Sequence, residues 1–482
     1  MATPLLAALQ QCAQSSNAPF YTPGHKRGQG TPEILANLLG SRIWRSDLPE
    51  LPELDNLFAP QGAIRSAQNL AAEAFGAEQT WFLVNGSTCG VIAAILATCE
   101  AGDKIILPRN VHQSAISGLI LSGAVPIFVN PDYDAACDIA HSVTPQAVEQ
   151  ALRQHPDSKA VMIVYPTYHG VCGDVEAIAD LAHQRNIPLL VDEAHGAHFA
   201  FHPGLPDSAL SAGADLAVQS THKTLSALTQ AAMLHCQGRR VDRDRVSKAL
   251  QLVQSTSPSY LLLASLDAAR QQMATQGSAL VEQTLRLADQ GRSRIQQIPH
   301  LSTLNPEQAG QTSGFWALDR TRLTVTVSEL GMDGFRADEI LHQALGVTAE
   351  FPSLRHLTFI ISLGNTQADI DRLVQALTTL VTLKNSPIQR TPASVIQDSK
   401  RSPLSPRQAF FAPSETLAIA QTVDRISAEL VCPYPPGIPV LLPGEQISEA
   451  AIANLQEILA SGGIISGCAD SSLKTLRVVK GA

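Results

Sequence analysis

The spacing of apolar residues between Gln79 and Cys236 limits the possible folds more than any other feature of this sequence. In this stretch, short runs rich in valine and isoleucine alternate with longer amphipathic segments. Strands of a parallel sheet are buried on both faces and are therefore continuously apolar, and helices connect them. The pattern predicts an α/β domain with one mainly parallel sheet of seven strands, at residues 80–84, 104–107, 125–129, 160–164, 188–191, 215–218 and 231–235.

The segments on either side of this sheet suggest further domains. A loop-rich arm dense in glycine and proline precedes the sheet, and a long helix at 260–297 follows it. Strands at 323–327 and 356–361 and a helix at 367–380 then indicate a smaller α+β domain, and a helix at 416–430 is expected to open a last module. The predicted boundaries are 1–62 for the arm, 63–297 for the large domain, 298–384 for the small domain, 385–408 for a proline-containing linker and 409–482 for a C-terminal domain.

Charge and cysteine content exclude several classes of function. The 34 lysine and arginine residues are outnumbered by 43 aspartate and glutamate residues, and the net charge of −9 offers no basic surface for nucleic acid. Eight scattered cysteines without a CxxC pair favour reduced thiols. The first residues lack the basic region of a signal peptide, and no apolar run approaches the ~18 residues of a membrane span. We expect a cytoplasmic protein that binds neither nucleic acid nor a membrane.

Two polar motifs stand where neighbouring strands of the predicted sheet end. One is Asp192-Glu193-Ala194-His195-Gly196, directly after the 188–191 strand, and the other is Ser220-Thr221-His222-Lys223, after the 215–218 strand. Ligands of open α/β sheets bind at the carboxyl ends of the strands. The 31 positions from Asp192 to Lys223 accommodate one crossover and one strand, so we expect these two side chains to lie at adjacent strand ends.

Three chemistries compete for the first motif. Asp-Glu-Ala-His resembles the acidic box of helicase ATPases, but these enzymes also need a phosphate loop containing Gly-Lys, and that dipeptide is absent from the sequence. His195, His198 and His202 could bind a metal together with Asp192 or Glu193, but their spacing matches no strong zinc signature, so we expect no metal. The third and favoured chemistry is that of a pyridoxal phosphate enzyme.

A pyridoxal phosphate site needs a lysine for the cofactor's aldehyde, a carboxylate at its pyridine nitrogen, a phosphate cradle and a flat group over its ring. Lys223 and Asp192 supply the first two parts. A helix that begins after the 80–84 strand offers backbone N–H groups and hydroxyls to a phosphate. The predicted cradle consists of Gly86, Ser87 and Thr88 together with Ser220 and His222, and the expected stacking residue is His112.

The sequence also resembles the Orn/Lys/Arg decarboxylases, a family of fold-type I pyridoxal phosphate enzymes. The matching motifs are Thr22-Pro23-Gly24-His25-Lys26, Leu54-Asp55-Asn56-Leu57, Asn85-Gly86-Ser87-Thr88, Arg109-Asn110-Val111-His112-Gln113-Ser114, and the two motifs that contain Asp192 and Lys223. A proline-rich motif at 433–439, followed by Pro443-Gly444-Glu445, resembles the C-terminal domain of the family. The resemblance therefore covers nearly the whole chain.

This resemblance implies an aspartate-aminotransferase-like fold in a homodimer or higher homo-oligomer, of the short form without an amino-terminal flavodoxin-like domain. It also implies that Ala194 lies beneath the cofactor ring and that His195 approaches the phenolic oxygen. Asp192 is expected to keep the pyridine nitrogen protonated, and Lys223 or His112 to return a proton after CO₂ leaves. The segment at 47–50, Asp-Leu-Pro-Glu, departs from the family's usual Asp-x-Thr-Glu, which leaves open how the arm shapes the substrate pocket.

The expected activity is the decarboxylation of a basic amino acid, with arginine to agmatine in polyamine biosynthesis preferred over lysine or ornithine. Such a substrate needs an acidic group at its distal cation, and Glu53, Asp55 and Glu415 are the candidates. An aminotransferase or lyase is the alternative within the same fold, and Arg355 would be available for the substrate carboxylate. The alternative of another class is a non-catalytic regulator.

Overall fold

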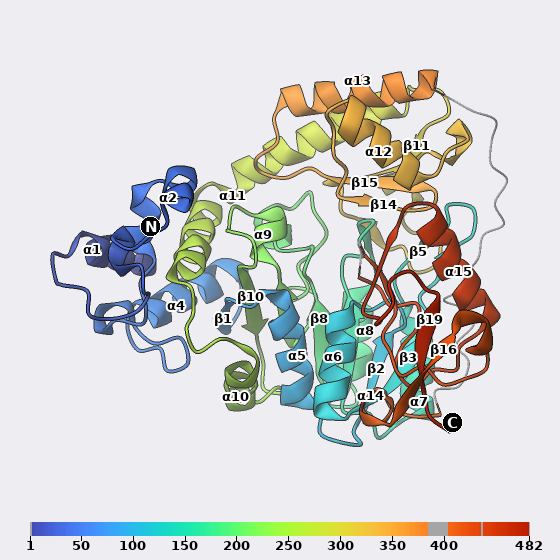
Figure 1. The fold of residues 1–482 in the computed structure, drawn as a ribbon, viewed down its shortest axis with the longest axis horizontal. Helices are drawn as coiled ribbons and strands as arrows, with labels where there is room; N and C mark the ends of the chain where they lie inside the picture. The colour runs from blue at the N-terminus through green and yellow to red at the C-terminus, as the bar shows by residue number, and fades with distance from the viewer. Residues whose placement is uncertain (1, 384–402, 435–436, 482) are drawn as a thin grey trace.

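A seven-stranded sheet forms the centre of the computed structural model, which describes residues 2–383, 403–434 and 437–481 (Figure 1). The strand order is β1-β10-β9-β8-β6-β2-β3, and β10 runs antiparallel to both of its neighbours while the other neighbouring pairs are parallel. All seven predicted strands are confirmed within one residue at each end. They are β1 Gln79–Leu83, β2 Lys104–Pro108, β3 Val125–Val129, β6 Ala160–Val164, β8 Leu189–Asp192, β9 Leu216–Gln219 and β10 Ala232–Cys236.

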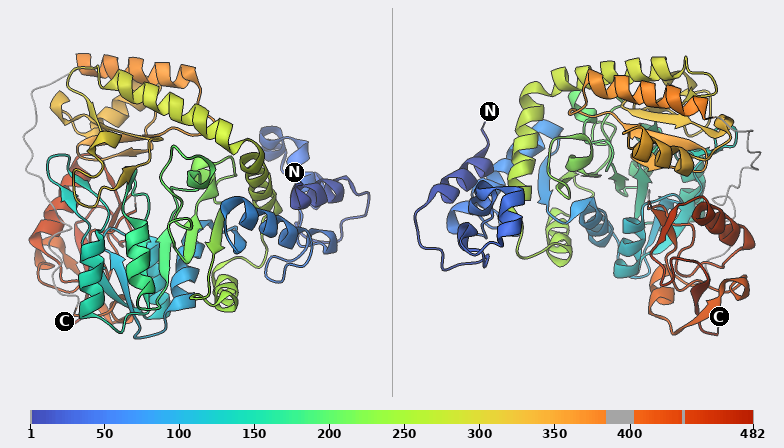
Figure 2. Two further views of the ribbon diagram at one scale, coloured as in Figure 1. Left: turned by 180° about the vertical axis from the view of Figure 1, so that it is seen from behind. Right: turned by 45° about the horizontal axis from the view of Figure 1, so that its top comes forward.

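Helices cover both faces of this sheet, which explains the continuous apolar runs. Along β8, Leu190 packs into one core cluster, whereas Leu189 and Val191 pack into the cluster on the other face. The first core also contains side chains of α5, α6 and α10, and the second contains side chains of α4, α7 and α8. Figure 2 shows helices on either side of the central sheet. The helix bounds are α4 Ala63–Phe75, α5 Gly86–Thr98, α6 Gln113–Ser122, α7 Pro145–Gln154, α8 Val175–His183 and α10 Arg243–Val253.

The small domain is an antiparallel sheet covered by helices. Its strand order is β11-β13-β15-β14, and the long helix α11 contributes to its core as well as to the large domain: Met273 packs into the large-domain core and Ile295 into the small-domain core. This finding confirms the predicted long helix, strands and α+β class. The bounds are α11 Tyr260–Ile295, β11 Ser302–Thr303, β13 Arg322–Thr326, α12 Gly334–Ala344, β14 Phe351–Pro352, β15 His356–Ile360 and α13 Gln367–Thr382.

The C-terminal domain corrects one prediction. The helix expected at 416–430 is wrong: β16 Ser414–Ala418 pairs antiparallel with β19 Thr475–Val479, and its exposure alternates from residue to residue as in a strand. The domain's main helix is instead α15 Glu449–Ala460, and β17 Cys432–Tyr434 pairs with β18 Ile464–Ser466. Most of the predicted linker, 385–402, lies outside the described residues, and its last residues form the start of α14 Pro406–Phe411.

The amino-terminal arm packs on α4 and α11. Its helices are α1 Pro4–Gln14, α2 Glu33–Leu39 and α3 Ser41–Ser46. The buried carboxylate of Asp267 in α11 accepts hydrogen bonds from the backbone N–H groups of Leu5 and Leu6, at 3.0 and 3.2 Å. These N–H groups lack partners within α1 because they belong to its first turn. The bonds to Asp267 therefore hold the start of the arm against α11. Within the described ranges, no helix combines the length and the apolar character required to cross a bilayer.

A buried ion pair docks the C-terminal domain onto the large domain. Arg109 follows β2, and its guanidinium donates to the backbone oxygens of Pro439 and Val440 at 2.9 and 3.0 Å and to the Glu445 carboxylate at 2.8 Å. Arg109 and Glu445 are only 8% and 9% exposed. Burial raises the pKa of Glu445, and Arg109 opposes that rise. Loss of either partner would therefore leave the other side chain buried without its counter-charge.

Replacing Arg109 with methionine should loosen the C-terminal domain. The substitution leaves Glu445 buried without its cation, and breaking a buried pair in this way costs about 3–5 kcal/mol. Amide hydrogen exchange over 437–445, measured by mass spectrometry, should accelerate by about tenfold or more. Arg407→Met is the control, because exposed Arg407 in α14 also reaches large-domain backbone, at Ile120 and Leu121. Equal exchange in the two variants would contradict the anchoring role.

Candidate active site

Asp192 and Lys223 come together at the carboxyl edge of the sheet. Asp192 is the last residue of β8 and lies opposite Val218 of the parallel strand β9. The chain leaves β9 into the short helix α9 Thr221–Thr224, which carries Lys223. Both side chains line one cavity, together with Ser87, His112, Ala194 and His195. The predicted position at adjacent strand ends is confirmed.

The Asp192 carboxylate is buried without a full set of partners. It is 6% exposed, and within the described residues it accepts one hydrogen bond, from the backbone N–H of Ala194 at 3.2 Å. Burial raises its pKa, while the positive charge of Lys223 acts in the opposite direction. A buried carboxylate is destabilising without a partner. The Asp192 carboxylate is therefore suited to bind a ligand whose cationic group donates a hydrogen bond to it.

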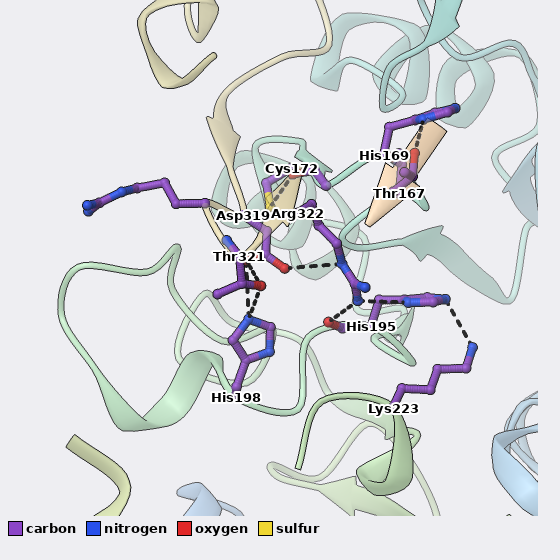
Figure 3. A network of polar contacts seen from close by, with 12 residues as sticks. Thr167, His169, Cys172, His195, His198, Lys223, Asp319, Thr321 and Arg322 are labelled. Atoms are coloured by element: carbon purple, nitrogen blue, oxygen red, sulfur yellow. Dashed lines mark hydrogen bonds and ion pairs between the residues drawn. The ribbon is translucent and has the colours of Figure 1, made fainter. Parts of the chain in front are cut away.

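Lys223 contacts the imidazole of His195 (Figure 3). Its Nζ lies 3.0 Å from His195 Nε2 and 5.6 Å from the ring centre of Tyr168. Burial lowers the pKa of Lys223; Asp192 opposes this effect, and Arg322 adds to it. The pKa of His195 also lies well below its usual value, first because of burial and then because of Lys223 and Arg322. This environment favours the uncharged amine, which is the nucleophilic form of lysine.

The first turn of α5 lies where the phosphate cradle is predicted. Gly86 opens the helix with φ +74°, in the left-handed region that favours glycine. Asn85, at the N-cap, accepts from the backbone of Ser255 and makes no capping bond to α5, so the N–H groups of the first turn stay available. Ser220 donates to Ser87 at 2.7 Å and joins α9 to this turn.

Two further predicted cofactor residues, Thr88 and His222, lie next to Ser87 and Lys223 in the sequence. Thr88 is exposed in the first turn of α5, beside Ser87. His222, next to Lys223, is hydrogen-bonded through Nδ1 to the Ala231 oxygen at 2.9 Å, and burial lowers its pKa. Four of the predicted cofactor residues are absent from the cavity lining, namely Gly86, Thr88, Ser220 and His222. The other predicted cofactor residues form part of the lining.

His112 lies between the large and the C-terminal domains. It is the N-cap of α6 and accepts from the Ser114 backbone N–H at 3.2 Å. The backbone of Gly437 packs against its ring so closely that a Cβ there would lie 2.9 Å from His112 Nε2. Burial, and then the charge of Lys223, lower the pKa of His112 to about 4. The ring is therefore neutral at physiological pH and presents a flat surface to the cavity.

Sequence reasoning missed several residues of the site. Pro166, Thr167 and Tyr168 line the cavity because they follow the carboxyl end of β6, and the strand-end rule that located Asp192 could have located them. The Tyr168 ring lies 4.3 Å from the His195 ring. Asn110 and Ile438 also line the cavity and stand inside motifs that were recognised without assigning them a role.

The three candidate substrate acids do not line this cavity in the single chain. The Asp55 carboxylate accepts from backbone N–H groups of the arm and of the start of α4, including Gly62 at 2.7 Å, and thereby fixes the arm's turn. Glu415 pairs with Arg425 within the C-terminal domain at 2.7 Å. Glu53 lies in the short 3₁₀ turn of the arm. Arg355, the candidate for a substrate carboxylate, is also outside the lining.

The histidines of the metal alternative point to different partners. His195 contacts Lys223 and Arg322, His198 lies 3.2 Å from Asp319, and His202 lies 3.0 Å from Glu282. Within the described ranges, no group of three or more histidine, cysteine, aspartate or glutamate side chains is arranged to hold a metal ion.

Comparisons with known proteins agree with this geometry. The sequence model of one protein family, the Orn/Lys/Arg decarboxylase major domain, matches residues 3–369. The sequence model of the family's C-terminal domain matches residues 393–462. An arginine decarboxylase of Bacillus subtilis is 40% identical over 99% of this chain and 98% of its own length, and an arginine decarboxylase of Halalkalibacterium halodurans is equally similar. Lysine decarboxylase LdcA of Pseudomonas aeruginosa is 26% identical, over 93% of this chain and 74% of its own.

Solved structures show the same fold. The lysine decarboxylase LdcF of Francisella novicida superposes with a TM-score of 0.85 over 99% of this chain and 81% of its own, at 21% identity. A ureidoglycine–glyoxylate aminotransferase of Bacillus subtilis covers 68% of this chain and 87% of its own, at 12% identity and a TM-score of 0.54. The expected aspartate-aminotransferase-like architecture is thereby confirmed. By its match to both domain models and to full-length relatives, this chain belongs to the Orn/Lys/Arg decarboxylase family.

Proposed function

We propose that this protein is a pyridoxal phosphate-dependent decarboxylase that converts arginine to agmatine and CO₂. The observation that carries the proposal is the shared cavity of Lys223, with its lowered pKa, and the buried carboxylate of Asp192. The choice of arginine is supported by the relatives that are 40% identical over almost the full length of both chains. Lysine and ornithine are the alternative substrates. A cytoplasmic role in polyamine supply belongs to the same proposal.

The residues of the cavity fit the cofactor. The under-partnered Asp192 carboxylate suits a protonated pyridine nitrogen, and the uncapped start of α5 with Ser87 suits a phosphate. Ala194 leaves space beside the ring, and His112 offers its neutral face. When bound, pyridoxal phosphate supplies an electron sink for the electrons released as CO₂ leaves.

The chain's own groups then have distinct tasks. Lys223 is positioned to bind the aldehyde, since its lowered pKa favours the nucleophilic amine. Asp192 stabilises a positive charge at the pyridine nitrogen. The C-terminal loop at Gly437 and Ile438 covers His112 and excludes water from the cavity on that side. For the return of a proton to the substrate carbon, Lys223 and His112 are both candidates.

Lys223→Ala tests the assignment of the cofactor lysine. The variant should lose covalent attachment of pyridoxal phosphate, measured by borohydride reduction and mass spectrometry, and its kcat should fall by about 10³-fold or more. Lys248→Ala, an exposed lysine of α10, is the control and should retain both properties. Cofactor attachment at another lysine in Lys223→Ala would refute the assignment.

Glu350 is the acid that we propose for the distal cation of the substrate. It immediately precedes β14, whose Phe351 packs on Tyr168 of the cavity with ring centres 5.6 Å apart. Although burial, Asp192 and Arg322 are the larger influences, the Glu350 charge also acts on the pKa of Lys223 and raises it. Like the three earlier candidates, Glu350 is outside the cavity lining. Its side chain is exposed, and among the described residues its carboxylate has no hydrogen-bond or ion-pair partner that a cation would have to displace.

Glu350→Gln should weaken binding of arginine while leaving the chemical groups in place. A charge-assisted hydrogen bond is worth about 1.5–3 kcal/mol, which corresponds to a rise in KM of roughly ten- to a hundredfold. Glu339→Gln is the control. It removes an exposed charge of the small domain that pairs with Arg336 in α12, and it should leave KM unchanged. Steady-state CO₂ release with arginine, lysine and ornithine gives the comparison. An unchanged KM for all three would eliminate Glu350 as the cation site.

Product analysis separates the rival activities. A decarboxylase releases CO₂ and an amine, whereas an aminotransferase releases a keto acid without CO₂, and a regulator releases neither from any of the three amino acids. The known aminotransferase neighbour shares the fold alone at 12% identity.

We also propose that the protein is a homodimer or a higher homo-oligomer. In α2, Ile34 and Leu38 are 83% and 78% exposed, and apolar side chains exposed in this way favour burial against another chain. The double variant Ile34→Asp/Leu38→Asp should sediment at a lower mass than the wild-type protein. Ile464→Asp, which changes an apolar residue of β18 that is 65% exposed, should not change the mass. An unchanged mass in the double variant would exclude α2 from the interface.

A further inference from the structure

A chain of polar contacts leads from the small domain to Lys223 (Figure 3). Lys223 Nζ lies 3.0 Å from His195 Nε2, and on the other side of the imidazole His195 Nδ1 lies 2.9 Å from Arg322 Nη2. Arg322 is the first residue of β13 and is 1% exposed, so this contact joins the two domains in a buried place. Each ring nitrogen of His195 therefore has one partner.

The partners determine where the hydrogen of His195 resides. A guanidinium has only N–H donors and stays protonated, so His195 Nδ1 must accept the hydrogen bond from Arg322. A neutral imidazole with an accepting Nδ1 carries its hydrogen on Nε2, which must then donate. The atom that receives this hydrogen is Lys223 Nζ. A lysine nitrogen can accept only as the neutral amine, because the ammonium form has no lone pair.

We propose that Arg322 is a positioning residue that fixes the hydrogen of His195 on Nε2 and thereby holds Lys223 as a neutral amine. The inference deepens the proposed function, since a neutral amine is the form in which Lys223 binds an aldehyde. The donor–acceptor order itself follows from the two contacts of His195 and does not depend on which substrate the enzyme uses.

Arg322 is held rigidly in this orientation. Its Nε forms an ion pair with Asp319 Oδ2 at 3.5 Å, and its Nη2 also donates to the His195 backbone oxygen at 3.3 Å. Asp319 is fixed in turn by His198 at 3.2 Å and by the Thr321 hydroxyl at 2.7 Å. Gly170 packs on the stem of Arg322, where an added Cβ would lie 2.8 Å from the Cβ of Arg322. The guanidinium therefore has little freedom to turn away from His195.

Other charged and titratable groups also face Lys223. Burial is the largest influence on its pKa, which it lowers; Asp192 raises the pKa, Arg322 lowers it and Glu350 raises it. The positive form of Lys223 disfavours positive charge on the neighbouring histidines and lowers their pKa. The charged and titratable groups around Lys223 are Asp192 at the end of β8, His195 after it, His112 at the start of α6, Tyr168 after β6, His222 beside Lys223, Glu350 before β14 and Arg322 in β13.

The position of the hydrogen can be measured directly in the full-length protein freed of its cofactor. After labelling with ¹⁵N-histidine, the wild-type His195 ring should give an unprotonated Nδ1 and a protonated Nε2 signal, assigned by its disappearance in His195→Gln. In Arg322→Met the hydrogen should move, wholly or in part, to Nδ1. A protonated Nδ1 in the wild-type protein would overturn the proposal, even if Arg322→Met did not fold.

The consequence for Lys223 is tested by labelling it with acetic anhydride across a range of pH values, with mass spectrometry of the modified peptide. In Arg322→Met the apparent pKa of Lys223 should rise by about one unit, since its ammonium can then donate to His195 Nε2. Arg320→Met is the matched control, because Arg320 lies two residues away and pairs with Asp289 instead. Equal shifts in the two variants would overturn the proposal.

A pair of His195 variants separates hydrogen bonding from charge. Glutamine can accept from Arg322 through its oxygen and donate to Lys223 through its amide, whereas leucine can do neither. His195→Gln should therefore keep the Lys223 pKa close to that of the wild type, and His195→Leu should raise it. If Arg322 acted through its charge alone, the two variants would give the same Lys223 pKa, and the relay would be rejected.

Discussion

The parallel pairing of β8 with β9 is the constraint on which the site depends. Its register sets Asp192 opposite Val218, and the chain then needs only a short turn to bring Lys223 to the same edge. A slip of one residue would turn the Asp192 side chain to the opposite face of the sheet. The apolar residues before Asp192 pack alternately into the two cores, so the burial of these residues holds the register. Ordinary core packing thus determines the position of the charged groups.

These charged groups are buried at a cost in stability. Burial removes water from the charged forms of both Asp192 and Lys223. As a result, the pKa of Asp192 is raised and the pKa of Lys223 is lowered. Such groups at a cavity are typical of a site built for a ligand, because a ligand can supply the interactions that burial removed. The same reasoning explains why the first turn of α5 lacks a side-chain cap.

The sequence was most informative where one local rule controls the structure. Seven strands could be predicted because burial on both faces requires continuous apolar runs, and Asp192 and Lys223 could be placed because they follow two of them. Arg322 could not be predicted, because its contact with His195 arises only when the small domain docks. The prediction of a helix at 416–430 was wrong because the first residues of this segment alternate in exposure and pair with a strand about sixty residues later. Neither relation is local in sequence.

The long helix α11 gives this arrangement a mechanical property. Its residues as far as Leu285 contribute to the large-domain core, and those from Leu287 to Ile295 contribute to the small-domain core. The helix is unbroken over this length, but it changes direction between its two ends (Figure 2). Two bodies that share a continuous helix cannot rotate freely about a flexible loop, since any relative movement must bend backbone hydrogen-bonded along its length. The position of β13 relative to the sheet edge therefore depends on the course of α11 as well as on the contact between Arg322 and His195.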